Sequence, residues 1–261
     1  MMILNWGTKN NGANNSSFNT KGGTGKTTTA AAMTQALTHK GYRVLAIDFD
    51  PQRNLTFAIG GDEDKPNIYN LLKDDIIPTE AVQCANSVNI IAGSAAMSMF
   101  ASEFSYKDDQ EYLLAGALEP FKNVYDFLII DTAPVLNLSL INVLVASDDI
   151  IIPMTADIFS VQGLIDLHGT IELVKEKNTK LTIAGLLLTR FPSRTRLGKE
   201  MKETITEMAS QLGTKLFKTV IRESAGIREI QVQQQNLFKL LRSRPTQDYS
   251  DFVDEYLQGR K

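Results

Sequence analysis

Short apolar runs alternate along the chain with longer segments of helix-forming residues. Residues 27–40 are rich in Ala, Thr, Gln and Leu, contain no proline or glycine, and predict a helix that ends at Gly41. Residues 199–212 predict an amphipathic helix, and the polar residues 60–66 an exposed loop. Apolar runs predict five buried strands, at residues 43–48, 127–131, 149–153, 183–189 and 218–221. This alternation is typical of βαβ units, so we expect an α/β fold with a mostly parallel, twisted sheet and helices on both faces.

Polar residues stand where several predicted strands end. Asp48 closes the first of these strands, Asp131 follows an apolar run, and Thr189 and Arg190 close a later one. Open α/β sheets bind their ligands at the carboxyl ends of the strands. These side chains therefore indicate a ligand site at one edge of the sheet, and we expect Thr189 and Arg190 to contact the base of a nucleotide.

A glycine-rich segment directly before the first helix predicts a phosphate-binding loop. Its glycines permit backbone conformations closed to other residues, and the start of the following helix directs positive partial charge at an anion. Lys26 can bridge the β- and γ-phosphates, and the Thr27 hydroxyl can bind Mg²⁺. The spacing departs from G-x-x-x-x-G-K-[ST], because Thr20 stands where the first glycine would be, and a second lysine precedes Lys26 by five residues. The predicted nucleotide-binding loop comprises Lys21, Gly22, Gly23, Thr24, Gly25, Lys26, Thr27 and Thr28.

The stretch before this loop lacks the buried strand that a phosphate loop normally follows. Residues 7–17 read GTKNNGANNSS, so only residues 3–6 or 16–18 could supply the strand. Either the first strand is degenerate or displaced, or the natural N-terminus differs from this one. We expect residues 1–17 to be atypical and irregular.

Composition is that of a globular protein with one domain. The chain has 261 residues, 43% hydrophobic and 22% charged, which predicts a single domain over residues 1–261. No apolar run approaches the roughly 20 residues of a membrane span, and the first residues do not resemble a secretory signal. The single cysteine, Cys84, excludes an internal disulfide framework and a cysteine-rich metal site. We therefore expect the protein in the cytoplasm.

Charge is distributed unevenly. Residues 1–185 hold 13 Lys/Arg and 21 Asp/Glu, whereas residues 186–244 hold 12 and 5. A basic segment on an acidic body indicates a surface that faces a polyanion, although a solvated charged face remains an alternative.

The segment K-G-G-T-G-K-T-T is similar to the deviant Walker A motif, K-G-G-x-G-K-T-[ST], of the ParA/MinD superfamily of ATPases. The similarity continues at residues 48–54, 125–134, 185–189 and 220–229, and covers roughly residues 18–258. The resemblance implies a P-loop NTPase fold and a slow, partner-stimulated, Mg²⁺-dependent hydrolysis of ATP to ADP and phosphate.

The resemblance also implies roles for individual residues. Lys21 would reach across an ATP-bound homodimer to the nucleotide of the partner, and Lys26 would hold the phosphates. Asp50 would orient the attacking water. Asp131 would hold Mg²⁺ through water, with Thr27 as a ligand and Asp48 near the magnesium shell.

Chain composition distinguishes among branches of this superfamily. Electron transfer needs cysteines for an iron–sulfur cluster, and arsenite pumps need metalloid-binding cysteines. A membrane cycle needs a basic amphipathic C-terminal helix, whereas residues 247–257 are acidic. The partition branch remains, and basic residues in two regions would form its DNA surface: Arg194, Arg196, Lys199, Lys202, Arg222 and Arg228. The second region departs from chromosomal relatives, because Gly226 stands where they often carry arginine and Arg222 replaces a proline.

We therefore expect a ParA-type partition ATPase without an operator-binding domain before the loop. In this family ATP closes a homodimer, the dimer binds nucleoid DNA non-specifically, and a centromere-bound ParB-like adaptor stimulates hydrolysis, which drives plasmid or chromosome segregation. The resemblance implies a cytoplasmic, nucleoid-associated protein with no membrane partner. Three alternatives are a ParA-like ATPase that positions a protein cargo rather than DNA, an inactive nucleotide-binding regulator, and a membrane-cycling ATPase.

Overall fold

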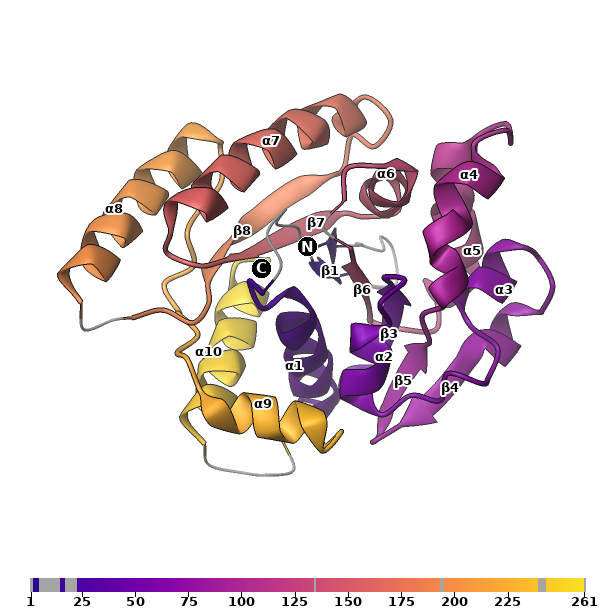
Figure 1. The fold of residues 1–261 in the computed structure, drawn as a ribbon, viewed down its shortest axis with the longest axis horizontal. Helices are drawn as coiled ribbons and strands as arrows, with labels where there is room; N and C mark the ends of the chain where they lie inside the picture. The colour runs from indigo at the N-terminus through magenta and orange to yellow at the C-terminus, as the bar shows by residue number, and fades with distance from the viewer. Residues whose placement is uncertain are drawn as a thin grey trace.

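The computed structural model describes residues 2–4, 15–16, 23–133, 135–192, 195–238 and 243–260. An eight-stranded sheet runs through its centre, with helices on both faces (Figure 1). Six strands are parallel: β2 (Asn15–Ser16), β3 (Val44–Phe49), β5 (Val88–Ile91), β6 (Phe127–Thr132), β7 (Asp149–Met154) and β8 (Thr182–Leu188). The short β1 (Met2–Leu4) lies antiparallel to β6 and β7, and β4 (Val82–Ala85) lies antiparallel to β5. The predicted fold class is confirmed.

The central strands are buried along their whole length and carry mostly apolar residues, because both of their faces are covered. Every residue of β3, β6 and β7 is buried. A strand of a parallel sheet between two helical layers shows a continuous hydrophobic run instead of alternation. This explains why the sequence pattern located these three strands to within one residue at each end.

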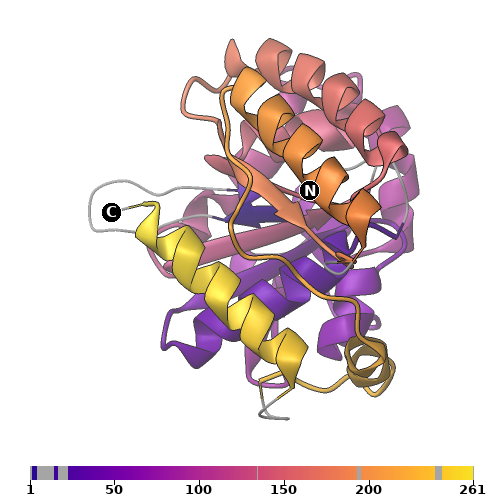
Figure 2. The same cartoon turned by 90° about the vertical axis from the view of Figure 1, so that its left-hand side faces the viewer.

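Two sets of helices cover the two faces (Figures 1 and 2). One face, with the side chains of Val44, Ala46 and Ile129, packs against α1 (Lys26–His39), α2 (Asn54–Ile59), α9 (Ala225–Val232) and α10 (Arg244–Gln258). The other face, with Leu45 and Ile130, packs against α3 (Ile68–Leu72), α4 (Phe100–Phe104), α5 (Leu113–Leu118), α6 (Leu138–Val145), α7 (Ile158–Lys175) and α8 (Arg196–Gln211). Four 3-10 helices also lie in the described residues: Pro78–Ala81, Ala95–Met99, Gln110–Tyr112 and Glu119–Phe121.

Both N-terminal segments that the sequence offered as a first strand pair with the sheet. Asn15–Ser16 runs parallel to β6 and β7, and it is the strand that precedes the phosphate loop. It is two residues long, which agrees with the polar character of this stretch.

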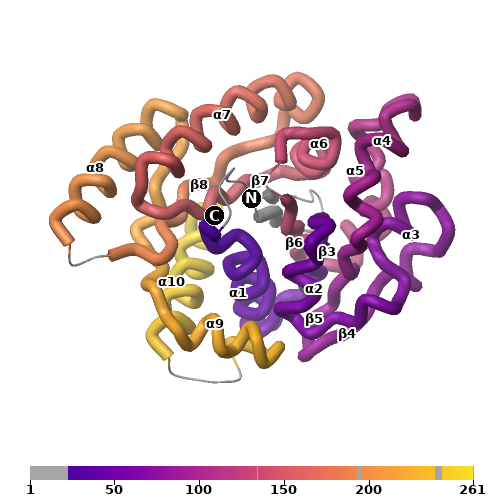
Figure 3. Tube along the Cα trace, viewed as in Figure 1, coloured from indigo at the N-terminus to yellow at the C-terminus, as the bar shows by residue number. Residues whose placement is uncertain are grey.

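The strand predicted at residues 218–221 was wrong. After α8 the chain runs beside β8 without forming a strand, and only Leu216 makes a bridge, to Leu186 (Figure 3). The amides of Lys218 and Thr219 donate instead to the two carboxylate oxygens of Glu255 on α10, at 2.7 and 2.8 Å. A side chain from another element thus takes the hydrogen bonds that would have extended the sheet.

Across the described residues, no helix has both the length and the apolar character needed to cross a membrane.

Candidate nucleotide site

The phosphate loop enters α1 through two glycines with left-handed backbone. Gly23 has φ 85° and Gly25 has φ 80°, conformations that cost little only for glycine. Gly25 caps α1, so Lys26 and Thr27 occupy the first turn, whose backbone N–H groups have no partner within the helix. Such a turn suits an anion such as a phosphate. Lys21 and Gly22, also predicted here, lie outside the described residues.

The carboxyl end of β8 holds this loop in place. The Thr189 hydroxyl donates to the carbonyl oxygen of Thr24 at 2.7 Å, and Arg190 donates to the carbonyl oxygen of Gly23 at 3.1 Å. Thr189 is buried, so its side chain supports the loop from below. The predicted contact of both residues with adenine remains a prediction, and Arg190 is the one of the two that lines the neighbouring cavity with an exposed side chain.

Lys26 is buried at the foot of the loop between two carboxylates. Its side chain is 8% exposed. Burial lowers the pKa of its ammonium group, and the charges of Asp131 and Asp50 oppose that change. The cation is therefore placed where phosphate oxygens would bind.

Asp131 is a buried carboxylate at the start of α1, beside the Thr27 hydroxyl. It is fully buried at the end of β6, and neither oxygen accepts a hydrogen bond of ordinary geometry from a described residue. Burial raises its pKa to about 6, and the nearby Thr27 hydroxyl acts in the opposite direction. A carboxylate held this way fits a cation beside Thr27.

This arrangement suits Mg²⁺ with a nucleotide rather than a metal held by protein alone. Within the described ranges, no group of three or more His, Cys, Asp or Glu side chains could hold a metal. Mg²⁺ usually keeps several waters and binds one or two carboxylates together with substrate phosphates. Asp131 and the Thr27 hydroxyl match that donor set.

Asp48 and Asp50 differ in what surrounds them. Asp50 accepts a hydrogen bond from the Gln52 amide at 2.8 Å and lines the large cavity beside Lys26. Asp48 is fully buried, and its carboxylate accepts from the Thr56 amide and hydroxyl, both at 2.7 Å, and from the Asp50 amide at 3.2 Å. Burial raises the pKa of Asp48 to about 7. These contacts make Asp48 the support of the turn that positions Asp50, and its place near a magnesium shell stays a prediction.

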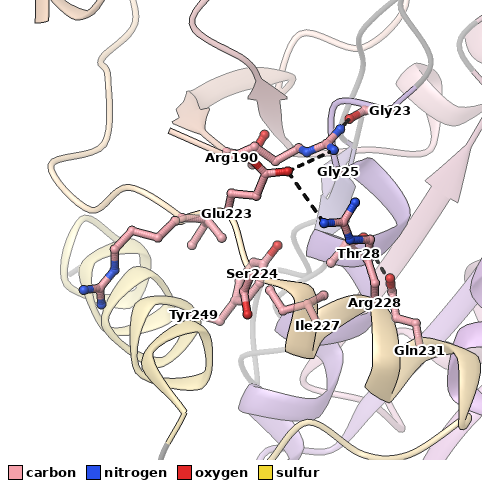
Figure 4. A pocket seen from close by; sticks show the side chains of 13 residues that line it. Gly23, Gly25, Thr28, Arg190, Glu223, Ser224, Ile227, Arg228, Gln231 and Tyr249 are labelled. Atoms are coloured by element: carbon pink, nitrogen blue, oxygen red, sulfur yellow. Dashed lines mark hydrogen bonds and ion pairs between the residues drawn. The ribbon is translucent and has the colours of Figure 1, made fainter. Parts of the chain in front are cut away.

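Two cavities meet over the first turn of α1. The larger, of about 640 Å³, is lined by Lys26, Thr27, Asp50 and residues of α2 and α9. The smaller, of about 230 Å³, lies between the loop, the end of β8, residues 221–224 and Tyr249 (Figure 4). Five residues line both cavities: Gly23, Gly25, Thr28, Arg228 and Gln231.

Helices α9 and α10 contribute to the site in ways that the sequence pattern did not reveal. Gln231 donates to the Thr28 hydroxyl at 3.0 Å, and the hydroxyls of Tyr249 and Thr29 lie 3.2 Å apart in the buried interior. Asp248, in the acidic segment 247–257, is 6% exposed and pairs with Arg222. Asp248 precedes the buried Phe252 by four residues and Tyr256 by eight, a helical spacing that would have indicated that its side chain faces inward.

The basic residues predicted to bind DNA fall into two groups. Arg196, Lys199 and Lys202 lie on α8, and the Arg196 side chain is 93% exposed with Glu200 as its ion-pair partner. Arg222 and Arg228 line the smaller cavity on the opposite face of the sheet, beside and on α9. Arg194 lies outside the described residues. Of the five residues that the structure describes, three thus lie on one face of the sheet and two on the other.

A glycine-rich loop at the start of a buried helix, with a lysine and aspartates at the ends of parallel strands, defines a P-loop nucleotide-binding protein. Residues 16–183 match the family model described as AAA domain. The sporulation initiation inhibitor protein Soj of Bacillus subtilis is 36% identical over 216 residues, covering 81% of this chain and 84% of that protein. The chain belongs to the ParA/Soj family of partition ATPases.

Solved structures agree with this assignment. A putative plasmid partition protein from Borrelia burgdorferi bound to AMPPNP has a TM-score of 0.77 at 27% identity, covering 94% of this chain and 98% of that one. Cobyrinic acid a,c-diamide synthase from Mycobacterium smegmatis, with a bound ATP analogue and magnesium, has a TM-score of 0.80 at 27% identity, covering 94% and 93%.

Proposed function

We propose that this protein is an ATP-dependent dimerising switch that binds DNA non-specifically and hydrolyses ATP to ADP and phosphate to drive plasmid or chromosome segregation. The observation that carries the proposal is the buried carboxylate of Asp131 beside Thr27 and Lys26 at the start of α1, which accepts no hydrogen bond of ordinary geometry from the described residues, in a chain of the ParA/Soj family. ATP, ADP and Mg²⁺ are the ligands that this site would take, and structural relatives hold an ATP analogue and magnesium.

Different residues of the site would bind the phosphates, hold the cation and orient the attacking water. The first-turn amides of α1 and the Lys26 ammonium bind phosphate oxygens, and Thr27 with Asp131 holds the cation. Magnesium bound there would offset the charge of the phosphates. Asp50 lines the cavity beside Lys26 and can accept a hydrogen bond from the attacking water. Lys21, by resemblance to the family, acts on the nucleotide of the partner in the dimer.

DNA binding is assigned to the basic residues of the first region, Arg194, Arg196, Lys199 and Lys202, with α8 as its exposed part. Arg196 and Lys199 are exposed, and Lys202 lies 5.9 Å from the centre of the Phe191 ring. Contacts of this kind neutralise phosphates without reading bases, so binding depends on salt and not on sequence. A ParB-like centromere-binding adaptor would stimulate hydrolysis, and the protein would act in the cytoplasm on the nucleoid.

Fluorescence anisotropy with a duplex of arbitrary sequence tests this proposal. We expect wild-type protein to bind with ATP and Mg²⁺, to release DNA with ADP, and to lose affinity as salt rises. Lys26→Ala removes the response to ATP, because the loop loses its phosphate cation. Arg194→Ala keeps ATP hydrolysis, weakens binding to all sequences, and lowers the salt slope by about 1.

Two outcomes would contradict the proposal in different ways. DNA affinity that ignores both nucleotide and salt would overturn the switch. Hydrolysis that requires Lys26, without DNA binding at any salt concentration, would favour the positioning of a protein cargo.

A further inference from the structure

Arg228 lies where the two cavities of the nucleotide site meet. It lines both of them, together with the loop residues Gly23 and Gly25. One turn further along α9, Gln231 is anchored by its hydrogen bond to the Thr28 hydroxyl. That bond fixes α9 against the first turn of α1, so Arg228 is held beside the phosphate loop (Figure 4).

The guanidinium of Arg228 has one weak partner. Its Nη2 atom lies 3.9 Å from Oε1 of Glu223, beyond hydrogen-bond distance, and it makes no hydrogen bond to any described residue. Arg190 approaches the same Glu223 oxygen more closely, at 3.3 Å. A guanidinium carries five donors, so Arg228 has unused donors at the cavity.

Neighbouring Arg222 shows what a fully engaged arginine looks like in this segment. It donates to both oxygens of the buried Asp248, with its Nε 2.9 Å from Oδ2. Arg222 is therefore a structural ion pair, whereas Arg228, with 65% of its side chain exposed, keeps the freedom to turn towards a ligand.

We propose that Arg228 is a ligand of the bound nucleotide. When nucleotide binds, Arg228 moves away from Glu223 and donates hydrogen bonds to the diphosphate that ADP and ATP share. This rests on the proposed function of the loop as a nucleotide site. A nucleotide that reaches from the smaller cavity to Lys26 passes Gly25 and Thr28, which line both cavities together with Arg228. Glu223 competes with the phosphates for Arg228 and so opposes nucleotide binding. Arg228 thus serves the nucleotide rather than DNA.

Calorimetric titration of the purified full-length protein with ADP and Mg²⁺, without DNA, tests the proposal. We expect Arg228→Gln to weaken ADP about tenfold or more, because a charge-assisted hydrogen bond to phosphate is lost. Arg228→Lys recovers part of the loss, since lysine keeps the charge without the planar fork. Glu223→Gln tightens ADP binding, and this gain is smaller in the Glu223→Gln, Arg228→Gln double variant.

Arg43→Gln is the matched control. Arg43 is an exposed arginine that pairs with Asp126 at the opposite edge of the sheet, away from both cavities. Its removal should leave ADP affinity unchanged, and thermal unfolding verifies that each variant is folded. ADP affinity equal to wild type in Arg228→Gln, or a Glu223→Gln gain that is undiminished without Arg228, would overturn the role of Arg228. Failure of the wild type to bind ADP would instead refute the nucleotide site itself.

Discussion

Asp48 and Asp131 are register partners on the neighbouring strands β3 and β6, and both are fully buried. Their surroundings are opposite in kind. Asp48 receives hydrogen bonds from Thr56 and from the Asp50 amide, whereas Asp131 receives none of ordinary geometry from the described residues. Asp48 therefore supports a turn, whereas Asp131, in the adjacent position of the next strand, is suited to bind a cation.

Substitution by asparagine should separate these two roles. Asp131→Asn removes a buried charge whose desolvation outweighs the attraction of nearby Lys26, so we expect the ligand-free protein at pH 8 to gain about 1–3 kcal/mol in free energy of unfolding. The variant should also lose the extra stabilisation that Mg²⁺ adds to ADP. Asp48→Asn should lose about 1–3 kcal/mol, because an amide N–H₂ would face donors. Urea denaturation with and without Mg²⁺ and ADP measures both, and a less stable ligand-free Asp131→Asn would contradict the first.

Sequence could predict the residues of the phosphate loop because their chemistry is local. Gly23, Gly25, Lys26 and Thr27 are close together in the sequence. The glycines themselves indicate the left-handed backbone conformation that the loop adopts. The support of that loop by Thr189 was predictable only as a residue at a strand end, since its partner, the Thr24 carbonyl, is 165 positions away in sequence.

Among the elements, α10 has a structural role that its acidic sequence did not predict. Two turns apart on this helix, Asp248 and Glu255 accept hydrogen bonds from the backbone amides of Lys218, Thr219 and Arg222. These bonds shape the irregular segment that leads into the nucleotide cavity. Sequence predicted a strand there because its apolar pattern carries no information about a distant carboxylate that captures its N–H groups.

Glu255→Gln should loosen this segment. One side-chain amide oxygen replaces two carboxylate acceptors, so either Lys218 or Thr219 loses its partner, and we expect a loss of about 1–2 kcal/mol in free energy of unfolding. Asp251→Asn is the matched control, because Asp251 is on the exposed side of α10 and, among the described residues, accepts a hydrogen bond from Gln247 alone. Its effect should stay within about 0.5 kcal/mol in the same denaturation experiment. Equal effects of the two substitutions would contradict the role of Glu255.

At the scale of the whole molecule, charged side chains are buried at both ends of the strands, the carboxyl end and the amino end. At the end opposite the nucleotide site, Asp149 accepts from Thr182 and Tyr256 and pairs with Arg260 at 2.8 Å, which fixes the end of α10 to β7. Asp148 precedes Asp149 in the chain, and its buried Oδ2 accepts no hydrogen bond from the part of the chain that the structure describes. Burial raises the pKa of Asp148 to about 7, and the Asp149 charge adds to this, against Arg260 and two lysines.

The buried carboxyls with a raised pKa are Asp48, Asp131 and Asp148. They make the stability of the fold depend on pH in the direction opposite to that of paired surface carboxylates. A raised pKa means that the folded state binds more protons than the unfolded state between about pH 4 and pH 7, so stability falls as pH rises through that window. We expect the ligand-free protein to unfold at a higher temperature at pH 5.5 than at pH 8. Asp148→Asn should reduce this difference and raise the unfolding temperature at pH 8. Scanning calorimetry at both pH values measures it, and an unchanged pH dependence in Asp148→Asn would exclude this carboxyl as a source.

The bond from the Arg222 amide to Asp248 has a consequence for how such chains diverge. A proline at position 222 would have no N–H and no guanidinium, so it would leave an inward-facing acid at position 248 without either partner. Positions 222 and 248 are therefore expected to covary: lineages that adopt the proline shed the acid, and lineages that keep the acid avoid the proline. A chimera that joins α10 of one lineage to the segment before α9 of the other would then lose this contact.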